Sequence, residues 1–185
     1  GADIDQALLG AMDPPASKVR AEAARALAAR HVVVATGALL EAAVDTDGNV
    51  RNESLKALGV VAPIEALAPL AAVLIKIEDN GSRGEAVDAL VSIANRNDDI
   101  ETRSAPILKA LETCSGPARL SLLGVLGRIG GQNSLVAVRV ALKDNDPKVQ
   151  DTAIRALAEW PDATAAADLL GVVKSAASET QQVLA

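Results

Sequence analysis

Several residue types that define large classes of protein function are scarce in this chain. Its 185 residues include no Phe, no Tyr, one Trp, one Cys and one His. Without aromatic side chains the chain cannot build the base-stacking surfaces of single-strand-binding proteins. Acidic residues outnumber basic ones, 24 to 18, and this excess repels phosphate backbones and anionic lipid surfaces. We therefore expect no nucleic acid partner and no membrane partner.

Long apolar runs are also lacking. The longest uncharged apolar run near the middle covers residues 66–75, and about 20 residues are needed to cross a bilayer. The start, GADIDQALLG, has neither the basic nor the apolar region of a signal peptide. The end, SETQQVLA, stops in helix-forming residues without a capping Gly, Asn or Pro. These ends predict a fragment of a longer protein.

The compartment stays open at this point. A lone Cys excludes an internal disulfide and slightly favours the cytoplasm. A secreted or periplasmic location follows instead if the full-length chain has a signal peptide.

What the chain does contain is a repeat. A nine-residue core recurs as VRAEAARAL, VRNESLKAL, SRGEAVDAL, ARLSLLGVL and VQDTAIRAL, with starts roughly 31 to 36 residues apart. Each copy ends in a leucine, at Leu27, Leu58, Leu90, Leu126 and Leu157. A fixed period of this length is the signature of a stacked repeat architecture.

Each repeat is predicted to be a pair of helices. The cores are preceded by stretches with their own helical apolar period, at residues 6–12, 35–44, 64–77, 104–112, 134–142 and 166–173. Turns such as DPPAS, DTDGN and DNDP separate the two helices of a pair. One pair buries too little apolar surface to fold alone, whereas stacked pairs share a continuous core. We predict an all-α solenoid, an α-α superhelix of about five full hairpins and a truncated sixth, in units 3–31, 32–62, 63–96, 97–131, 132–161 and 162–185.

An arginine falls inside the apolar arc of the core helices. The second position of each core is Arg20, Arg51, Arg83, Arg119 and then Gln150. A buried guanidinium needs paired charge and satisfied donors. Carboxylates of the turns are the candidate acceptors, so we expect a structural ladder along the stack. Its predicted members are Asp13, Arg20, Asp45, Asp47, Arg51, Asp79, Arg83, Arg119, Asp144 and Asp146, with Glu78 as an alternative to Asp79; Gln150 and the Asp-free turn of the fourth unit predict interruptions.

The stretches DTDGNVRNESLKALG and DNDPKVQDTAIRALAEWP resemble the HEAT repeat, in particular the short HEAT-like class of phycobilisome lyase subunits. The resemblance covers nearly the whole chain and implies a single repeat domain, 1–185. It also implies a right-handed superhelix whose second helices line a concave, partner-binding face. The segment from residue 155 onward looks like HEAT-like parts of large bacterial multidomain proteins.

These observations favour a monomeric protein-interaction or scaffolding module that binds a protein or peptide. The alternatives are an accessory or substrate-recognition module of a lyase-type enzyme and a purely structural spacer. On the concave face, the polar columns of the core helices are either a partner-binding groove or ordinary solvated ion pairs. The candidate binding residues are Glu22, Arg25, Asn52, Glu53, Lys56, Glu85, Asp88, Ser121, Arg128, Thr152 and Arg155.

No catalytic constellation is apparent. His31 has no second metal ligand or nucleophile beside it in sequence, which favours a junction role. Cys114 lacks a base that would activate it and is expected to be a small filler. Trp160, just before Pro161, is expected to seal a contact between hairpins. We therefore predict a non-enzyme without a cofactor or metal, and the absence of paired His and Glu separates the chain from the HEAT-repeat enzyme deoxyhypusine hydroxylase.

Overall fold

The computed structural model describes residues 1–13 and 16–175, and this part of the chain is built from helices and turns without a strand. The prediction of an all-α fold is confirmed. The chain divides into two compact units, Gly1–Arg96 and Asn97–Ala185. The division coincides with the predicted boundary between the third and fourth hairpins. That residues 1–185 form a single domain stays a prediction.

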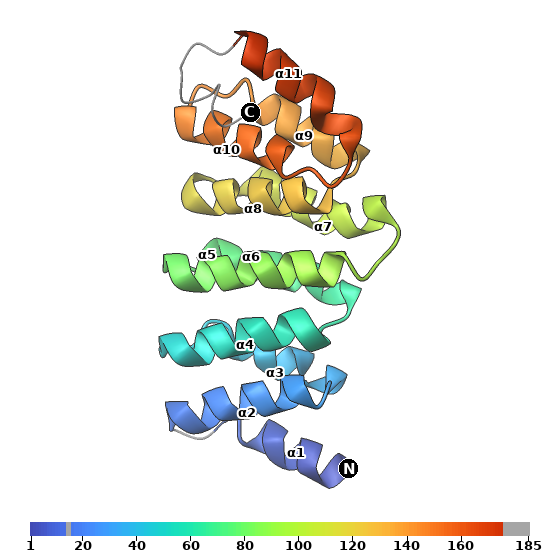
Figure 1. Cartoon of the computed structure of the whole chain (residues 1–185). Helices are drawn as coiled ribbons and strands as arrows, with labels where there is room; N and C mark the ends of the chain where they lie inside the picture. Colours follow the sequence, from blue (N-terminus) through green and yellow to red (C-terminus); the bar gives the residue numbers. More distant parts are fainter. Residues whose placement is uncertain (14–15, 176–185) are drawn as a thin grey trace. The chain divides into compact units, whose positions relative to one another are not determined.

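Unit 1 contains three helical hairpins. The second helices α2, α4 and α6 lie side by side in one layer, and the first helices α1, α3 and α5 form the layer behind it (Figure 1). Short 3-10 turns, η1 and η2, introduce α3 and α5. The bounds are α1 Ala2–Gly10, α2 Ser17–Ala29, η1 Val33–Ala35, α3 Thr36–Ala42, α4 Gly48–Val61, η2 Ile64–Ala66, α5 Leu67–Lys76 and α6 Asn80–Ala94.

Unit 2 contains two hairpins and one further helix. The second helices α8 and α10 pack against each other, and each also packs on its own first helix, α7 or α9. The bounds are α7 Ile100–Thr113, α8 Gly116–Ile129, α9 Gln132–Ala141, α10 Pro147–Ala158, η3 Ala163–Ala165 and α11 Ala166–Ser175. The predicted sixth unit is represented by η3 and α11, and the predicted cut through a helix at the chain end lies outside the described residues.

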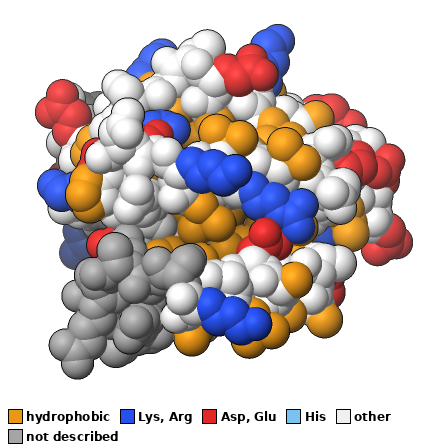
Figure 2. Space-filling view, turned by 90° about the horizontal axis from the view of Figure 1, so that it is seen from above, with side chains coloured by type: hydrophobic (Ala, Val, Ile, Leu, Met, Phe, Trp, Pro, Cys, Tyr) orange, Lys and Arg blue, Asp and Glu red, His pale blue; other side chains and the backbone are white. Residues whose placement is uncertain are grey.

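The helix α11 exposes apolar side chains. Leu170 is 60% exposed and Val173 is 44% exposed. Figure 2, which looks onto this end of the molecule, shows hydrophobic side chains gathered between basic and acidic ones.

No helix within the described residues is long and apolar enough to span a membrane.

Aspartates at the turns set where several helices begin. Asp47 is the N-cap of α4 and its carboxylate accepts the backbone N–H groups of Asn49 and Val50, at 2.9 and 3.2 Å. Asp79, Asp99 and Asp146 cap α6, α7 and α10 in the same way. The carboxylate satisfies backbone donors that have no partner inside the helix, and each helix therefore begins at its turn.

The core forms along the repeated leucines. All five leucines that end the repeat cores are at most 1% exposed. Small residues let neighbouring second helices approach closely: a Cβ placed on Gly59 would lie 3.3 Å from the Ala89 Cα, and one on Gly127 would lie 2.6 Å from the Ala156 Cα. The second helices thus pack through glycine–alanine contacts at equivalent positions of the two units.

Candidate functional site

Charged side chains form a continuous chain of ion pairs across the exposed side of α2, α4 and α6, called here the second-helix face. Arg25 contacts Glu22 at 2.6 Å on its own helix and Glu53 of α4 at 3.1 Å. Lys56 contacts Glu53 at 3.2 Å and reaches Glu85 of α6 at 3.6 Å. Charge therefore alternates along five side chains from three hairpins.

Glu53 is the centre of this chain. Its side chain is 13% exposed, compared with 52% for Arg25 and 51% for Lys56. Burial alone would raise the pKa of Glu53, but hydrogen bonds from Arg25 and Lys56 and their positive charges outweigh it and lower that pKa. The same hydrogen bonds and charges raise the pKa of Arg25 and of Lys56. These shifts favour the ionised forms of Glu53, Arg25 and Lys56, so the three side chains hold one another by opposite charges.

The other residues predicted for the concave face have more varied surroundings. Asn52 accepts a hydrogen bond from the Ser82 hydroxyl at 2.7 Å and so joins α4 to α6. Thr152 donates its hydroxyl to the Lys148 carbonyl of its own helix at 2.8 Å. Asp88 and Arg155 are exposed, and Ser121 and Arg128 are partly exposed. The described ion-pair chain is confined to unit 1, since Ser121 and Thr152 occupy the positions of its glutamates in unit 2.

Two of the predicted ladder arginines pair with a turn carboxylate, and in both cases the turn belongs to the next hairpin. Arg20 donates from Nε and Nη2 to the two carboxylate oxygens of Asp45, at 2.9 and 3.0 Å. Arg119 lies 2.8 Å from the Asp144 carboxylate. The Arg20 and Asp45 side chains are 15% and 14% exposed, so this bidentate pair links two hairpins from a largely buried position.

At the same repeat position, Arg51, Arg83 and Gln150 donate to backbone carbonyls. The expectation that each arginine of this position pairs with a turn carboxylate is therefore wrong for Arg51 and Arg83. Arg51 donates to the Asp45 and Thr46 carbonyls at 2.9 and 3.1 Å, and Arg83 donates to the carbonyls six and five residues before it, at 2.6 and 3.0 Å. Gln150 makes the same contact, donating to the Asp144 carbonyl at 2.6 Å. Gln150, where we expected an interruption of the carboxylate ladder, thus shares the backbone-carbonyl contact of Arg51 and Arg83.

The remaining turn aspartates do not pair with the arginines of this repeat position in the contacts described above. Asp47, Asp79 and Asp146 are helix N-caps, as described above, and hydrogen bonds lower the pKa of Asp47 and of Asp79. For Asp47 the largest cause is a hydrogen bond from Ser17 of the preceding hairpin. Asp13 is exposed.

Glu101 is a structural residue that the sequence pattern missed. Its carboxylate accepts the backbone N–H of Gln132 at 3.0 Å and a hydrogen bond from the Asn133 side chain. The N-cap position of α9 is Gly131, which has no side chain to cap the helix. A carboxylate from α7 therefore supplies the cap, and no local spacing in the sequence could indicate this long-range contact.

His31, Cys114 and Trp160 occupy positions that fit structural roles. His31, with φ at 53°, follows the end of α2; its N–H bonds to the Ala28 carbonyl and that of Val32 to the Leu27 carbonyl, the pattern of a Schellman motif. Burial raises the pKa of the Cys114 thiol. Trp160 is 8% exposed. No group of three or more potential metal ligands occurs in the described part of the chain.

Comparisons with known proteins place the fold. A family model described as HEAT repeats matches residues 104–185. The chain is similar to an engineered protein (TM-score 0.55, 23% identity, 98% of this chain and 93% of that chain covered). It is similar to the complex of CpcE and CpcF of phycocyanin lyase from Nostoc sp. PCC7120 (TM-score 0.57, 19% identity, 97% and 74% covered). It is also similar to Drosophila melanogaster Mini spindles TOG3 (TM-score 0.65, 13% identity, 96% and 89% covered). No curated protein matches the sequence.

Proposed function

We propose, from the premise that the chain is a HEAT-like repeat protein, that it is a protein-interaction module whose second-helix face binds a polypeptide partner. The observation that supports this surface is the alternating chain of Glu22, Arg25, Glu53, Lys56 and Glu85. The repeat fold holds these side chains on helices whose opposite sides are buried in the core.

The small energies of exposed ion pairs favour a role of the second-helix face in partner recognition over a role in stabilising the fold. Exposed ion pairs contribute only about 0.2–1 kcal/mol each to folding. The same pairs restrict the rotamers of long side chains before a partner arrives, which reduces the entropy that binding costs. Alternating charge also rejects partners with a mismatched pattern, so it adds specificity more than affinity. The expected partner is a polar polypeptide surface with complementary charges.

Charge reversal tests this proposal. The full chain and its Glu53→Lys/Glu85→Lys variant are used as baits for proteins of the source cells, and captured proteins are quantified by mass spectrometry. The matched control, Asp3→Lys/Glu65→Lys, makes the same charge change at exposed acidic residues of α1 and η2. We expect the first variant to lose partners that the control retains, with both showing wild-type circular dichroism. Identical capture by all three baits would refute a role for the second-helix face.

A second candidate function is an accessory or substrate-recognition module of a lyase-type enzyme. It is supported by the likeness of the fold to the CpcE and CpcF complex. Titration of the chain with a tetrapyrrole, followed by absorbance, distinguishes the two candidates: saturable binding would favour the lyase-type module, and its absence leaves the interaction module preferred.

A further inference from the structure

One asparagine of the chain is followed by glycine, in the pair Asn80–Gly81 at the start of α6. An asparagine in this setting can lose ammonia, because the backbone nitrogen of the next residue attacks the side-chain amide carbon. Glycine has no side chain that would obstruct this approach, whereas every other asparagine of the chain precedes a residue with a side chain. Asn80 is exposed, so water reaches the atoms that react. The pair is therefore a candidate site of covalent change.

The Arg83 guanidinium contacts the amide group of Asn80. Its Nη1 donates to the Asn80 Oδ1 at 2.7 Å. Negative charge develops on this oxygen when the amide carbon is attacked, and a positioned charged donor stabilises such an oxyanion. Arg83 is only 9% exposed, so solvent screens its charge weakly. The contact therefore favours attack at Asn80.

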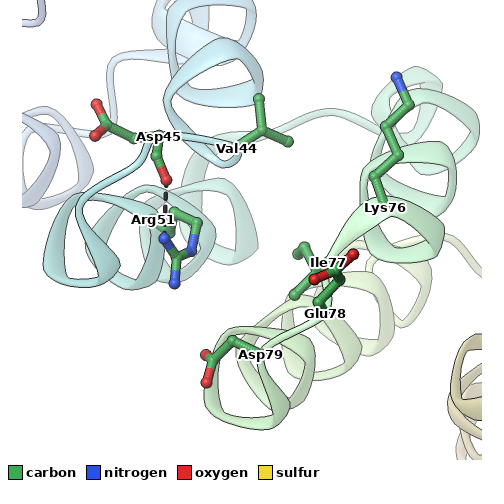
Figure 3. A pocket seen from close by; sticks show the side chains of 7 residues that line it. All are labelled: Val44, Asp45, Arg51, Lys76, Ile77, Glu78 and Asp79. Atoms are coloured by element: carbon green, nitrogen blue, oxygen red, sulfur yellow. Dashed lines mark hydrogen bonds between the residues drawn. The ribbon is translucent and has the colours of Figure 1, made fainter.

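The backbone around the reacting pair lies at the first turn of a helix. The preceding turn borders a depression of 360 Å³, with Glu78 and Asp79 on the α6 side and Arg51 across from them (Figure 3). The first N–H groups of a helix have no intrahelical partner, and the Asp79 carboxylate caps this turn by accepting the Ser82 N–H at 2.7 Å. Rotation of the Gly81 nitrogen toward the Asn80 side chain therefore breaks no helical hydrogen bond of that nitrogen.

Arg83 is a buried cation whose acceptors are neutral. It donates to two backbone carbonyls and to the Asn80 amide oxygen, and its Nε has no hydrogen-bond partner within the described residues. Arg20, at the same repeat position of α2, pairs with the carboxylate of Asp45. An aspartate at position 80 would give Arg83 an equivalent counter-charge and would place a negative charge at the N-terminus of α6, where the helix dipole favours it.

We propose that Asn80 is a site of spontaneous deamidation in the folded protein and that its aspartyl product forms an ion pair with Arg83. The Gly81 nitrogen bonds to the Asn80 Cγ, the bond from Cγ to the side-chain nitrogen breaks, and the proton of the attacking nitrogen ends on the ammonia that leaves. The product is a five-membered succinimide. Water then opens the ring. Addition at Cγ gives aspartate, and addition at the main-chain carbonyl carbon gives isoaspartate, with an extra methylene group in the backbone.

Incubation of the full chain at neutral pH in ¹⁸O-labelled water, followed by peptide mass mapping, tests the site. We expect Asn80 to be the first asparagine that loses ammonia and takes up one ¹⁸O atom. The Gly81→Ala variant should react severalfold more slowly than its matched control Gly84→Ala. Both substitutions favour the helix, and a Cβ at Gly84 meets nothing within 4 Å, so the comparison isolates access to the nitrogen of residue 81.

Three results of this experiment would overturn the assignment of the site. They are equal rates in the two alanine variants, earlier reaction at another asparagine, and an unreactive Asn80 in the folded chain under conditions where the urea-unfolded chain reacts.

The Arg83→Gln variant tests the assistance by the guanidinium. Gln150, at the same repeat position of α10, keeps the contact with the carbonyl six residues earlier, so glutamine should remove mainly the donor to Asn80. Each folded rate is divided by the rate of the same variant in urea, and hydrogen exchange of the Ser82 amide corrects for opening of the first turn. The corrected rate should fall about tenfold, because a hydrogen bond from a charged donor exceeds a neutral one by roughly that factor. An unchanged corrected rate would exclude a role of Arg83.

The Asn80→Asp variant reproduces the aspartyl product and tests the ion pair. Its midpoint in urea unfolding, followed by circular dichroism, should exceed that of wild type. The gain should shrink in the Arg83→Gln background, since the double-mutant cycle isolates the interaction of the two side chains. No gain, or an equal gain in both backgrounds, would refute the ion pair. None of these residues belongs to the charged chain of the second-helix face, so the outcome is independent of the proposed function.

Discussion

Replacing Gly127 by alanine tests how closely the second helices of unit 2 pack. A Cβ at this position would lie 2.6 Å from the Ala156 Cα and 2.7 Å from both its Cβ and its carbonyl oxygen. Carbon atoms in favourable contact are about 3.5–4.0 Å apart. All three contacted atoms belong to α10 backbone or to a Cβ fixed on it, so no flexible side chain is available to move. The substitution therefore pushes α8 and α10 apart by about 1 Å.

The expected energy follows from two opposing effects. Overpacking a core contact costs about 1–3 kcal/mol, and exchanging Gly for Ala inside a helix gains about 1 kcal/mol. Gly124, in the same helix, is the matched control because a Cβ there meets nothing within 4 Å. Gly124→Ala should have only the favourable helix effect. We therefore expect Gly127→Ala to be about 2 kcal/mol less stable than Gly124→Ala.

Urea unfolding monitored by tryptophan fluorescence measures this difference. Trp160 is the only tryptophan of the chain, is 8% exposed and lies in unit 2, so its emission reports on the unit that contains both substitutions. The two variants should differ in midpoint, with similar m-values. Equal midpoints for Gly127→Ala and Gly124→Ala would refute the close helix approach.

Four further predictions concern single side chains. Glu101→Ala removes the long-range cap of α9 and should cost about 1 kcal/mol in urea unfolding. The lowered pKa of Asp47 means that its carboxylate stabilises the fold above the ordinary value of about 3.9 and that this contribution is lost as the pH falls through the lowered pKa. The advantage of wild type over Asp47→Asn in thermal stability should therefore shrink as the pH is lowered from 6, and an advantage that grows on acidification would contradict this. Cys114 should react with iodoacetamide at pH 7 more slowly than a free thiol, because burial raises its pKa, and a rate equal to that of free cysteine would contradict this. Arg51→Gln should cost less stability by circular dichroism than Arg20→Gln, because only Arg20 pairs with a carboxylate.

The repeated helices were predictable from the sequence because apolar residues at the same positions of each repeat are buried. The five core leucines mark the second helices, and all are buried as their spacing implies. Helix starts were less predictable. The apolar period suggested a first helix of unit 2 from Ser104, whereas α7 begins at Ile100. The Asp99 carboxylate holds the N–H groups of Glu101 and Thr102, and these polar residues extend the helix ahead of its apolar stripe.

The candidate surfaces were predictable only in part, for a different reason. Helical spacing places Glu22 and Arg25 on one exposed face, but the contact of Arg25 with Glu53 depends on how two hairpins stack. Capping of α9 by Glu101 is a further case, since the two partners are 31 residues apart.

The second position of the core helices shows why a charged residue recurs inside an apolar arc. Arg51, Arg83 and Gln150 all donate to the carbonyl six residues earlier, and Arg103 at the start of α7 does the same at 3.2 Å. Carbonyls near the ends of helices and in turns lack helical partners, so the local requirement is an N–H donor on a long side chain and not a positive charge. Glutamine meets that requirement, which explains its presence at position 150. Charge becomes necessary only where the turn of the next hairpin presents a carboxylate, as Asp45 does to Arg20.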